Sequence, residues 1–291
     1  MGRVSSIKYR LLKKIATYLD IFLNQSGIII ELRENLSMVL SRSDSTSSQV
    51  EQRALSFVRR FKTWKSSTLS CIHIGNKNDG GYVMNRQPNI DILLTAGVGN
   101  DISFEKEINN LYPSCNILLL DHTVNKLPAH LKNSIFIKKG LGPDRLENHL
   151  TLFDLFTEFE IDKYKSPIMK IDIEGNEYKF LEDVDVKYLN RFDQLIIELH
   201  NLDWITDDYN SQLLEKSVNN LLINFKPIYV KVNNYGGFFS CGSSFFPKVI
   251  ELTLINNRFM SNAKQDITIL DEFRMKNNPY GLNYNLNELF K

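Results

Sequence analysis

The stretch Asp91-Ile-Leu-Leu-Thr-Ala-Gly-Val-Gly-Asn-Asp101, followed by Asn116-Ile-Leu-Leu-Leu-Asp121, decides the fold of this 291-residue chain. Each segment contains an apolar run of the length of a buried parallel strand, and residues 104–108 between them have helix-forming composition. Gly97 and Gly99 follow the first run, and glycine at a strand-to-helix turn lets bare backbone approach a ligand. The sequence therefore predicts a strand, a glycine turn, a helix and a second strand that ends in an acid.

Asp121 lies 22 positions after Gly99, where a carboxylate can accept hydrogen bonds from both hydroxyls of a ribose. A dinucleotide fingerprint has a third glycine three positions further on, but this chain has Ile102 there, so no pyrophosphate cradle is encoded. S-adenosylmethionine has no phosphate to hold. The motif therefore favours S-adenosylmethionine over NAD, although a lone Gly-x-Gly is also typical of an ordinary strand-to-helix turn.

The composition is that of a soluble globular protein, with 43% hydrophobic and 24% charged residues. A net charge of +1 argues against nucleic acid held by bulk electrostatics and favours a small or glycan-like substrate. Cys71, Cys115 and Cys241 are odd in number and widely spaced. They predict neither a zinc site nor a disulfide framework, and they favour a cytoplasmic location.

Residues 1–40 carry apolar side chains at helical spacing behind a basic front, and the serine-rich stretch 41–48 follows. We interpret residues 1–48 as an amphipathic helical arm with a linker, and residues 49–291 as one domain. Asp20 interrupts the longest apolar run and no cleavage site follows, so neither a membrane span nor a signal peptide is predicted. The arm fits packing on its own domain or on a second copy of the chain, with peripheral membrane association as the alternative.

From residue 90 onward, strand-like and helix-like segments alternate, which indicates a parallel sheet covered on both faces. Strands are expected at 92–95, 117–120, 135–137, 168–173, 194–199, 228–232 and 249–255, and helices at 104–110, 146–156, 177–181 and 213–223. Two shorter strands, 71–74 and 82–84, flank a glycine-rich loop. Because no helix is expected between the last two strands, they should form an antiparallel pair at one edge.

Ionisable side chains follow two of the expected strands. Asp172 and Glu174 alternate with a period of two, and so do Glu198 and His200. Ligands bind beyond the carboxyl ends of the strands in open α/β sheets, and buried charges are costly without a partner or a task. Each residue alone fits a helix cap or a structural histidine, but the four together predict a catalytic centre.

His200 is the leading candidate for a general base, because an imidazole with a pKa of about 6.5 accepts a proton at neutral pH. Glu198 would orient it, with Asp172 and Glu174 opposite. A divalent metal ion held by the carboxylates and the imidazole is the alternative, and it would act by lowering the pKa of the acceptor hydroxyl. Aromatic side chains that can stack on a sugar ring follow nearby: Trp204, Tyr209, Tyr235, Phe238 and Phe239.

A set of motifs over residues 70–257 resembles the FkbM-type family of S-adenosylmethionine-dependent methyltransferases. The motifs are Asp79-Gly-Gly-Tyr82, Ala96-Gly-Val-Gly-Asn-Asp-Ile-Ser-Phe-Glu105, Leu120-Asp121, Lys170-Ile-Asp-Ile-Glu-Gly175 with Glu177, Ile196-Ile-Glu-Leu-His200, Val232-Asn-Asn234 and Pro247-x-x-x-Glu-Leu252. The resemblance implies a class I, Rossmann-like methyltransferase fold with a seven-stranded sheet. It also implies methyl transfer to an oxygen, often a hydroxyl of a sugar or a polyketide-like molecule.

The resemblance further implies where the cofactor binds. Its candidate contacts are Asp79, Gly81, Tyr82, Gly97, Gly99, Asp101, Asp121, His122, Gly140, Leu141 and Asp172, with the two turn glycines at the methionine part, Asp121 at the ribose and Gly140 with Leu141 at the adenine. Thr95 stands where many members have an acid, so Asp101 or Asp79 would have to contact the cofactor's amino group. This departure leaves a non-catalytic assembly module as one alternative; an NAD-linked oxidoreductase, disfavoured by Ile102, is another.

Overall fold

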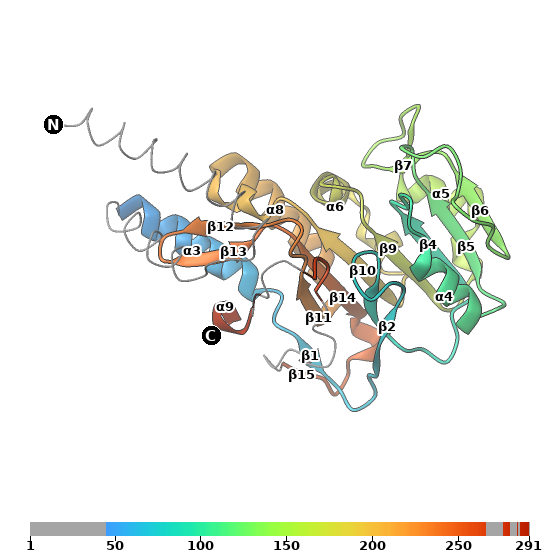
Figure 1. Cartoon of the computed structure of the whole chain (residues 1–291), viewed down its shortest axis with the longest axis horizontal. Helices are drawn as coiled ribbons and strands as arrows, with labels where there is room; N and C mark the ends of the chain where they lie inside the picture. The colour runs from blue at the N-terminus through green and yellow to red at the C-terminus, as the bar shows by residue number, and fades with distance from the viewer. Residues whose placement is uncertain (1–44, 266–275, 280–283, 285, 291) are drawn as a thin grey trace.

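A computed structural model describes residues 45–265, 276–279, 284 and 286–290, and its centre is a seven-stranded sheet (Figure 1). In spatial order the strands are β6 (Ser134–Ile137), β5 (Asn116–Leu120), β4 (Ile92–Ala96), β9 (Pro167–Ile171), β10 (Gln194–Leu199), β14 (Ile250–Asn256) and β11 (Phe225–Val232). Neighbours are parallel except at β14, which runs antiparallel to both β10 and β11. This strand order with β14 reversed is that of class I methyltransferases, so the predicted fold is confirmed.

The two faces of the sheet are covered by different elements, because alternate residues of each strand point to opposite faces. On one face, Leu93, Ile117 and Ile168 pack with α4 (Ser103–Leu111) and the hairpin of β2 (Cys71–Ile74) and β3 (Tyr82–Asn85). The other face packs against α3 (Ser45–Arg59), α5 (Leu152–Phe159), α6 (Glu177–Asp183) and α8 (Asp208–Leu222). Within the described part of the chain, no helix is long and apolar enough to cross a membrane.

The antiparallel pair expected at the edge is present as β11 and β14. The sequence did not show that β14 enters the sheet between β10 and β11, where it pairs with β10 over six residues from Gln194↔Ile255 to Leu199↔Ile250. Between β11 and β14 lies a hairpin of β12 (Phe238–Cys241) and β13 (Ser244–Pro247), which the sequence analysis missed. It lies beside α3, where Glu51 accepts hydrogen bonds from Ser243 and Ser244 (Figure 1).

Two expected boundaries differ in the structure. The helix expected from residue 146 begins at Leu152, because the Thr151 side chain accepts a hydrogen bond from Asp154 N and Asp154 accepts one from Thr151 N. The preceding residues form β8 (His149–Leu150), which pairs with β7 (Gly140–Leu141). Helix α3 begins at Ser45, inside the serine-rich stretch that we interpreted as a linker. The proposed arm itself, residues 1–40, lies outside the described residues.

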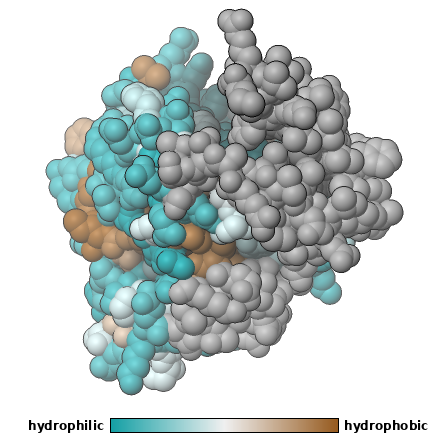
Figure 2. Space-filling view, turned by 90° about the vertical axis from the view of Figure 1, so that its left-hand side faces the viewer, coloured by the Kyte–Doolittle hydropathy of each residue, from teal (hydrophilic) through white to brown (hydrophobic). Residues whose placement is uncertain are grey.

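On the face seen in Figure 2, hydrophilic side chains surround a few separate hydrophobic areas.

The two glycines of the turn differ in their surroundings. Gly97 has φ +81°, and a Cβ added to it would lie 1.5 Å from the backbone oxygen of Asp172. Gly99 has φ +56°, and a Cβ there would meet no described atom within 4 Å. The first glycine is therefore required by packing, whereas the second borders open space.

We predict that Gly97→Ala destabilises the protein much more than Gly99→Ala. Both substitutions place a Cβ on left-handed backbone, at about 1–2 kcal/mol, but only Gly97→Ala also forces β9 away from the turn, so its total loss should exceed about 3 kcal/mol. Urea unfolding of the two variants measures the difference. Equal losses would show that the end of β9 yields to the added methyl group.

Candidate active site

The glycine turn holds the ends of three strands together. Gly97 N donates to Leu120 O on β5 at 2.9 Å, and Asp172 N, just after β9, donates to Ala96 O at 2.9 Å. Because Gly97 has no side chain, the backbone of Asp172 can lie directly against it. The turn thus lies between Asp121 at the end of β5 and Asp172 at the end of β9.

Asp121 is buried, and its carboxylate shapes the turn. One oxygen accepts hydrogen bonds from Val98 N at 2.9 Å and Gly99 N at 2.8 Å, and the other accepts from Thr123 N and Thr123 Oγ1 at 2.7 and 2.6 Å. Burial alone would raise the pKa of Asp121, but these hydrogen bonds outweigh it and lower the pKa. The sequence analysis gave Asp121 a ribose contact only; the structure adds a positioning role for the same two oxygens.

The four residues that the sequence analysis placed in a catalytic centre lie close together. The Tyr82 hydroxyl is within hydrogen-bond distance of Asp172 Oδ2 (2.9 Å) and Glu198 Oε2 (3.2 Å). His200 Nε2 lies 3.6 Å from both Glu174 Oε2 and Glu198 Oε1. Burial and the charge of Asp172 raise the pKa of Tyr82 well above its usual value, so Tyr82 stays a neutral donor between two acids. Tyr82 was expected at the cofactor, and the structure places its hydroxyl among the catalytic candidates.

Glu177, at the start of α6, sets the state of His200. Its Oε1 accepts hydrogen bonds from Ile173 N and Gly175 N, both at 3.1 Å, and lies 3.1 Å from His200 Nδ1. Burial alone would lower the pKa of His200, but Glu177, together with the charges of Glu198 and Asp172, raises it from 6.5 to about 9. Four carboxylates surround His200, and they favour its protonated form at neutral pH. Glu177 stood in a quoted motif, but we had given it no role.

A second buried acid, Glu251, lies beside Glu198 on the neighbouring strand. Glu198 on β10 lies directly opposite Glu251 on β14. Burial, then Asp172 and Glu251, raise the pKa of Glu198 well above its usual value, while Asn233 Nδ2 donates to its Oε1 at 2.7 Å. Burial raises the pKa of Glu251 as well, against the opposing effect of Lys231, whose Nζ lies 2.9 Å away. Burial is thus the largest cause of both shifts, and the neighbouring acids add to it at Glu198.

A separate ion pair lies under the glycine turn. Thr95 is fully buried, and its hydroxyl donates to Glu105 Oε1 at 3.1 Å. Lys170 Nζ lies 3.4 Å from that oxygen and 4.9 Å from the centre of the Tyr82 ring. Burial would lower the pKa of Lys170, but Glu105 and Asp172 raise it, so Lys170 stays charged. The acid missing at position 95 is thus present on α4, where it fixes Lys170 and does not face a ligand.

Asp101 and Asp79 were the two candidates for the cofactor's amino group. Asp101 accepts a hydrogen bond from the backbone N of Ser103, the first residue of α4, at 2.8 Å, and its other oxygen accepts from Asn76 Nδ2 at 2.5 Å. Both of its oxygens therefore serve the fold. Asp79 is exposed and accepts one hydrogen bond, from Asn277 Nδ2 at 3.2 Å, among the described residues. Of the two, Asp79 is the one with a free oxygen.

Nearby, Gly81 is buried, and a Cβ there would lie 1.8 Å from Asn76 O, so close packing requires a glycine at this position.

The predicted adenine end has a pair of histidines. Gly140 and Leu141 form β7, and a Cβ on Gly140 would lie 2.8 Å from His122 Nδ1 and 3.0 Å from His149 Nε2. The two imidazole rings are 5.0 Å apart at 47°. Burial, with a smaller effect of His122, lowers the pKa of His149. The sequence analysis missed His149 because it assigned this position to a helix.

The aromatic residues near the mouth have two different roles. Phe239 stacks on Phe246 at 5.3 Å, Trp204 packs beside Tyr178 at 6.4 Å and Phe238 belongs to the core. Tyr209 and Tyr235 are exposed, by 81% and 58%. Of the five candidates for sugar stacking, these two have free ring surface.

Asp172, Glu174 and His200 also offer one metal-ligand atom each within 4.8 Å of one another. The donor types suit a divalent ion. Metal binding requires a neutral imidazole, however, and at pH 7 a group with a pKa of about 9 is neutral in only about 1% of molecules. The ligand atoms of the cluster therefore suit a metal ion, but the protonated state of His200 opposes metal binding.

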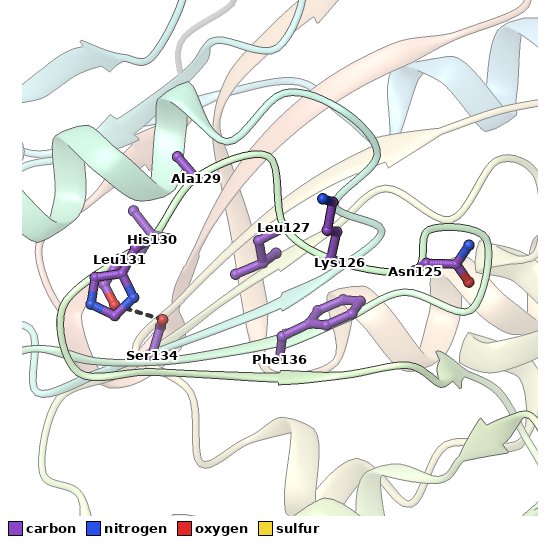
Figure 3. A pocket seen from close by; sticks show the side chains of 8 residues that line it. All are labelled: Asn125, Lys126, Leu127, Ala129, His130, Leu131, Ser134 and Phe136. Atoms are coloured by element: carbon purple, nitrogen blue, oxygen red, sulfur yellow. Dashed lines mark hydrogen bonds between the residues drawn. The ribbon is translucent and has the colours of Figure 1, made fainter.

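A hollow of about 420 Å³ lies away from these residues, outside edge strand β6 (Figure 3). Leu127 and Phe136 line it, and Ser134 Oγ donates to Leu131 O at 2.8 Å. It contains none of the acidic side chains described above. The candidate site is therefore the group of polar side chains at the carboxyl ends of β4, β9 and β10 and the amino end of the antiparallel strand β14.

No protein-family model matches the sequence, and no curated protein matches it. Three methyltransferases of known structure show distant similarity. Precorrin-6y C5,15-methyltransferase from Geobacter metallireducens GS-15 is 15% identical over 59% of this chain and 84% of that one, with a TM-score of 0.30. Antibiotic-resistance methyltransferase Kmr is 11% identical over 64% of this chain and 100% of that one (TM-score 0.31), and plantazolicin methyltransferase BpumL in complex with SAH is 12% identical over 85% of this chain and 100% of that one (TM-score 0.29). Similarity at this level assigns no activity, and the fold assignment depends on the strand order.

We predict that His200 makes the stability of the protein depend on pH in the alkaline range. A histidine whose folded pKa is raised contributes stability that is complete below about pH 6.5 and is lost as the pH rises through about 9. The free energy of unfolding of the wild type, relative to His200→Gln, should therefore fall by up to about 3 kcal/mol between pH 6 and pH 10. Urea unfolding across this range measures it. Exposed His130 provides the control variant His130→Gln, and a pH-independent difference for His200→Gln would contradict the prediction.

Proposed function

We propose that this chain is an S-adenosylmethionine-dependent methyltransferase. The observation that carries the proposal is the cluster of acids that follows β9 beside the glycine turn, where Asp172, Glu174 and Glu177 surround a single imidazole, that of His200. A sulfonium and an ammonium group are cations, and such a field stabilises both of them. The pyrophosphate of NAD would meet repulsion there, and Ile102 removes the third glycine that would cradle it.

The residues present fit this cofactor from end to end. Open space beside Gly99 accommodates the methionine part, and ribose hydroxyls would take the place of Thr123 at Asp121 Oδ1 while Oδ2 still holds Gly99 N. His122, Gly140 and Leu141 would surround the adenine. Asp79, with its free oxygen, would take the amino group in place of the acid missing at position 95.

The reaction we propose is transfer of the methyl group to a hydroxyl of a sugar, a glycan or a related small acceptor, as the FkbM-type resemblance implies. The bound cofactor supplies an electrophilic methyl group. Asp172 and Tyr82 would position the acceptor oxygen in line with it. Positive charge bound beside Asp172 lowers the pKa of His200, so His200 can release its proton and then accept one from the acceptor hydroxyl. Glu177 and Glu198 fix the imidazole for this transfer.

A metal-assisted transfer is the second candidate, favoured by the ligand atoms of Asp172, Glu174 and His200. The ion would lower the pKa of the acceptor hydroxyl in place of His200. We expect EDTA to leave methyl transfer unchanged, because a metal ion would first have to displace the proton that the surrounding carboxylates stabilise on His200. Loss of activity with recovery on adding magnesium would establish the metal mechanism.

We predict that the protein binds S-adenosylhomocysteine and not NAD, and that Asp121→Asn weakens binding by about 1.5–3 kcal/mol, because a charge-assisted hydrogen bond is lost. Gly99→Val should abolish binding, since its side chain enters the open space beside the turn. Titration calorimetry measures each affinity. Thr123→Val removes one hydrogen bond to Asp121 and keeps its charge, so it is the matched control. Binding of NAD would favour an oxidoreductase, and binding of neither ligand an assembly module.

We further propose that the N-terminal arm mediates association with a second copy of the chain or with a membrane surface, and that nucleic acid is not a partner. The amphipathic pattern of the arm and the net charge of +1 support these two statements. A cytoplasmic location is proposed from cysteine usage, since none of the three cysteines, all within the described part of the chain, forms a disulfide.

A further inference from the structure

We propose that the hollow beside β6 binds residues 28–40 of the N-terminal arm of a second copy of the chain, so that two copies exchange their arms. The inference rests on the association proposed above for the arm and gives it a receiving surface. It is independent of methyl transfer, because neither the hollow nor the segment belongs to the site proposed for that reaction.

The crossover from β5 to β6 differs from the other crossovers of the sheet. Helix α4 joins β4 to β5, α5 lies between β6 and β9, α6 with α7 (Val186–Leu189) between β9 and β10, and α8 between β10 and β11. Residues 121–133, all of them described, form no helix, and they include Pro128, which has no backbone N–H to donate. A helix usually covers a parallel crossover, so the sheet face over β6 is left partly open.

The open part of this face is apolar. Leu127, Ala129, Leu131 and Phe136 line the hollow, and Figure 3 shows Leu127 and Phe136 directed into the space between the loop and β6. Leu131 is buried, whereas the other three are half-buried at the margin of the cluster that packs α4 on the sheet. An occupant with apolar side chains would remove this margin from water, which is favourable.

A small polar ligand does not suit the hollow. Such ligands are oriented by a few polar groups that converge on them. Ser134 and Asn125 are the neutral polar side chains of the lining, and both already have partners: Ser134 Oγ donates to Leu131 O at 2.8 Å, and Asn125 Oδ1 accepts from Lys138 Nζ. The lining therefore favours apolar side chains carried by a larger partner.

The rim of the hollow selects the charge of that partner. Residues 122–143 contain four lysines, two histidines and no acid, and Lys126 and His130 on the rim are exposed. An acidic flank on the partner complements such a rim. Residues 3–14 of the arm contain five bases and no acid, so they do not match it. Residues 15–40 contain three acids and one base, so they do.

Residues 28–40 also have the required apolar pattern. Ile29, Leu32, Leu36 and Val39 follow one another at intervals of three, four and three residues, which is the spacing of one face of a helix. Glu31 is next to this face on a helical projection. An amphipathic helix that inserts its apolar face into a hydrophobic groove is a common mode of recognition, and here it would occupy the place of the missing crossover helix.

The chain's own segment does not reach the hollow. Residues 41–44 alone separate it from α3, which begins at Ser45, and five peptide steps span at most about 18 Å. The sheet places β6 about 29 Å from β11, at about 4.8 Å for each of six spacings. In Figure 1, α3 lies beyond β11 with its first turn outermost, and β6 lies at the opposite end of the molecule. The segment therefore comes from a second copy, and reciprocal exchange closes a two-fold dimer.

Analytical ultracentrifugation of the full-length protein tests the exchange. We expect the wild type to form a dimer. Ala129→Glu places a carboxylate in the hollow and Leu36→Glu places one on the segment, and each should raise the dissociation constant of the dimer at least tenfold, because a buried charge without a partner is costly. Ile135→Glu is the matched control: Ile135 lies on β6, is 55% exposed and points to the other face of the sheet, so its variant should leave the dimer unchanged.

A mixture of the two variants separates arm exchange from any other dimer. Leu36→Glu keeps an intact hollow and Ala129→Glu keeps an intact segment, so an equimolar mixture should form a heterodimer that is tighter than either variant alone. A fluorescent peptide of residues 28–40 should bind Leu36→Glu and not Ala129→Glu. His130→Glu, on the exposed rim, should also weaken the dimer, and it keeps the test valid where Ala129→Glu does not fold.

The outcomes separate the statements made here. A monomeric wild type, a dimer that neither Ala129→Glu nor His130→Glu weakens, or a mixture no tighter than its components overturns the exchange. Loss of the dimer in the hollow variants but not in Leu36→Glu overturns residues 28–40 as the occupant. Binding to anionic vesicles without dimerisation assigns the arm to a membrane surface. All variants should bind S-adenosylhomocysteine as the wild type does, and a lack of that binding contradicts the proposed methyl transfer alone.

Discussion

The close approach of Gly97 to the backbone of Asp172 is the constraint on which the rest of the site depends. With no Cβ on Gly97, Asp172 N reaches Ala96 O and the end of β9 lies against the turn. The same turn is held from the other side by Asp121, through Val98 N and Gly99 N. The open space beside Gly99 therefore lies next to the acids that follow β9. A ligand that fills this space contacts those acids.

Bringing β9, β10 and β14 side by side has an electrostatic consequence. Asp172, Glu198 and Glu251 end up in one low-dielectric region, where burial raises the pKa of both glutamates and the charges of Asp172 and Glu251 raise that of Glu198 further. His200 becomes the counter-ion of this region and is held protonated. A base that is blocked until positive charge arrives would couple proton removal to cofactor binding, since a cationic ligand lowers the pKa of His200 and relieves the repulsion among the acids at the same time.

The fold also recruits residues that are distant in the chain. Tyr82 comes from the hairpin before the sheet, Asn233 from the end of β11 and Asn277 from the C-terminal segment, and each donates to one of the clustered acids. Neutral donors of this kind stabilise buried carboxylates without cancelling their charge. The site thus keeps its attraction for cations while most of its acid oxygens remain partnered.

The sequence by itself determined the strands, the glycine turn and the acids at their ends, because period-two apolar runs and turn glycines are local signals. From these, Asp121, Asp172 and Glu198 could be placed at the carboxyl ends of the sheet. Only the tertiary structure decided that β14 enters between β10 and β11, since strand pairing joins residues about 60 positions apart, as Gln194↔Ile255 does. That insertion sets Glu251 opposite Glu198, where its charge helps to raise the pKa of Glu198. Burial and the charges of residues distant in the chain cannot be predicted from local sequence. The sequence therefore predicted the residue types of the site but not their protonation states.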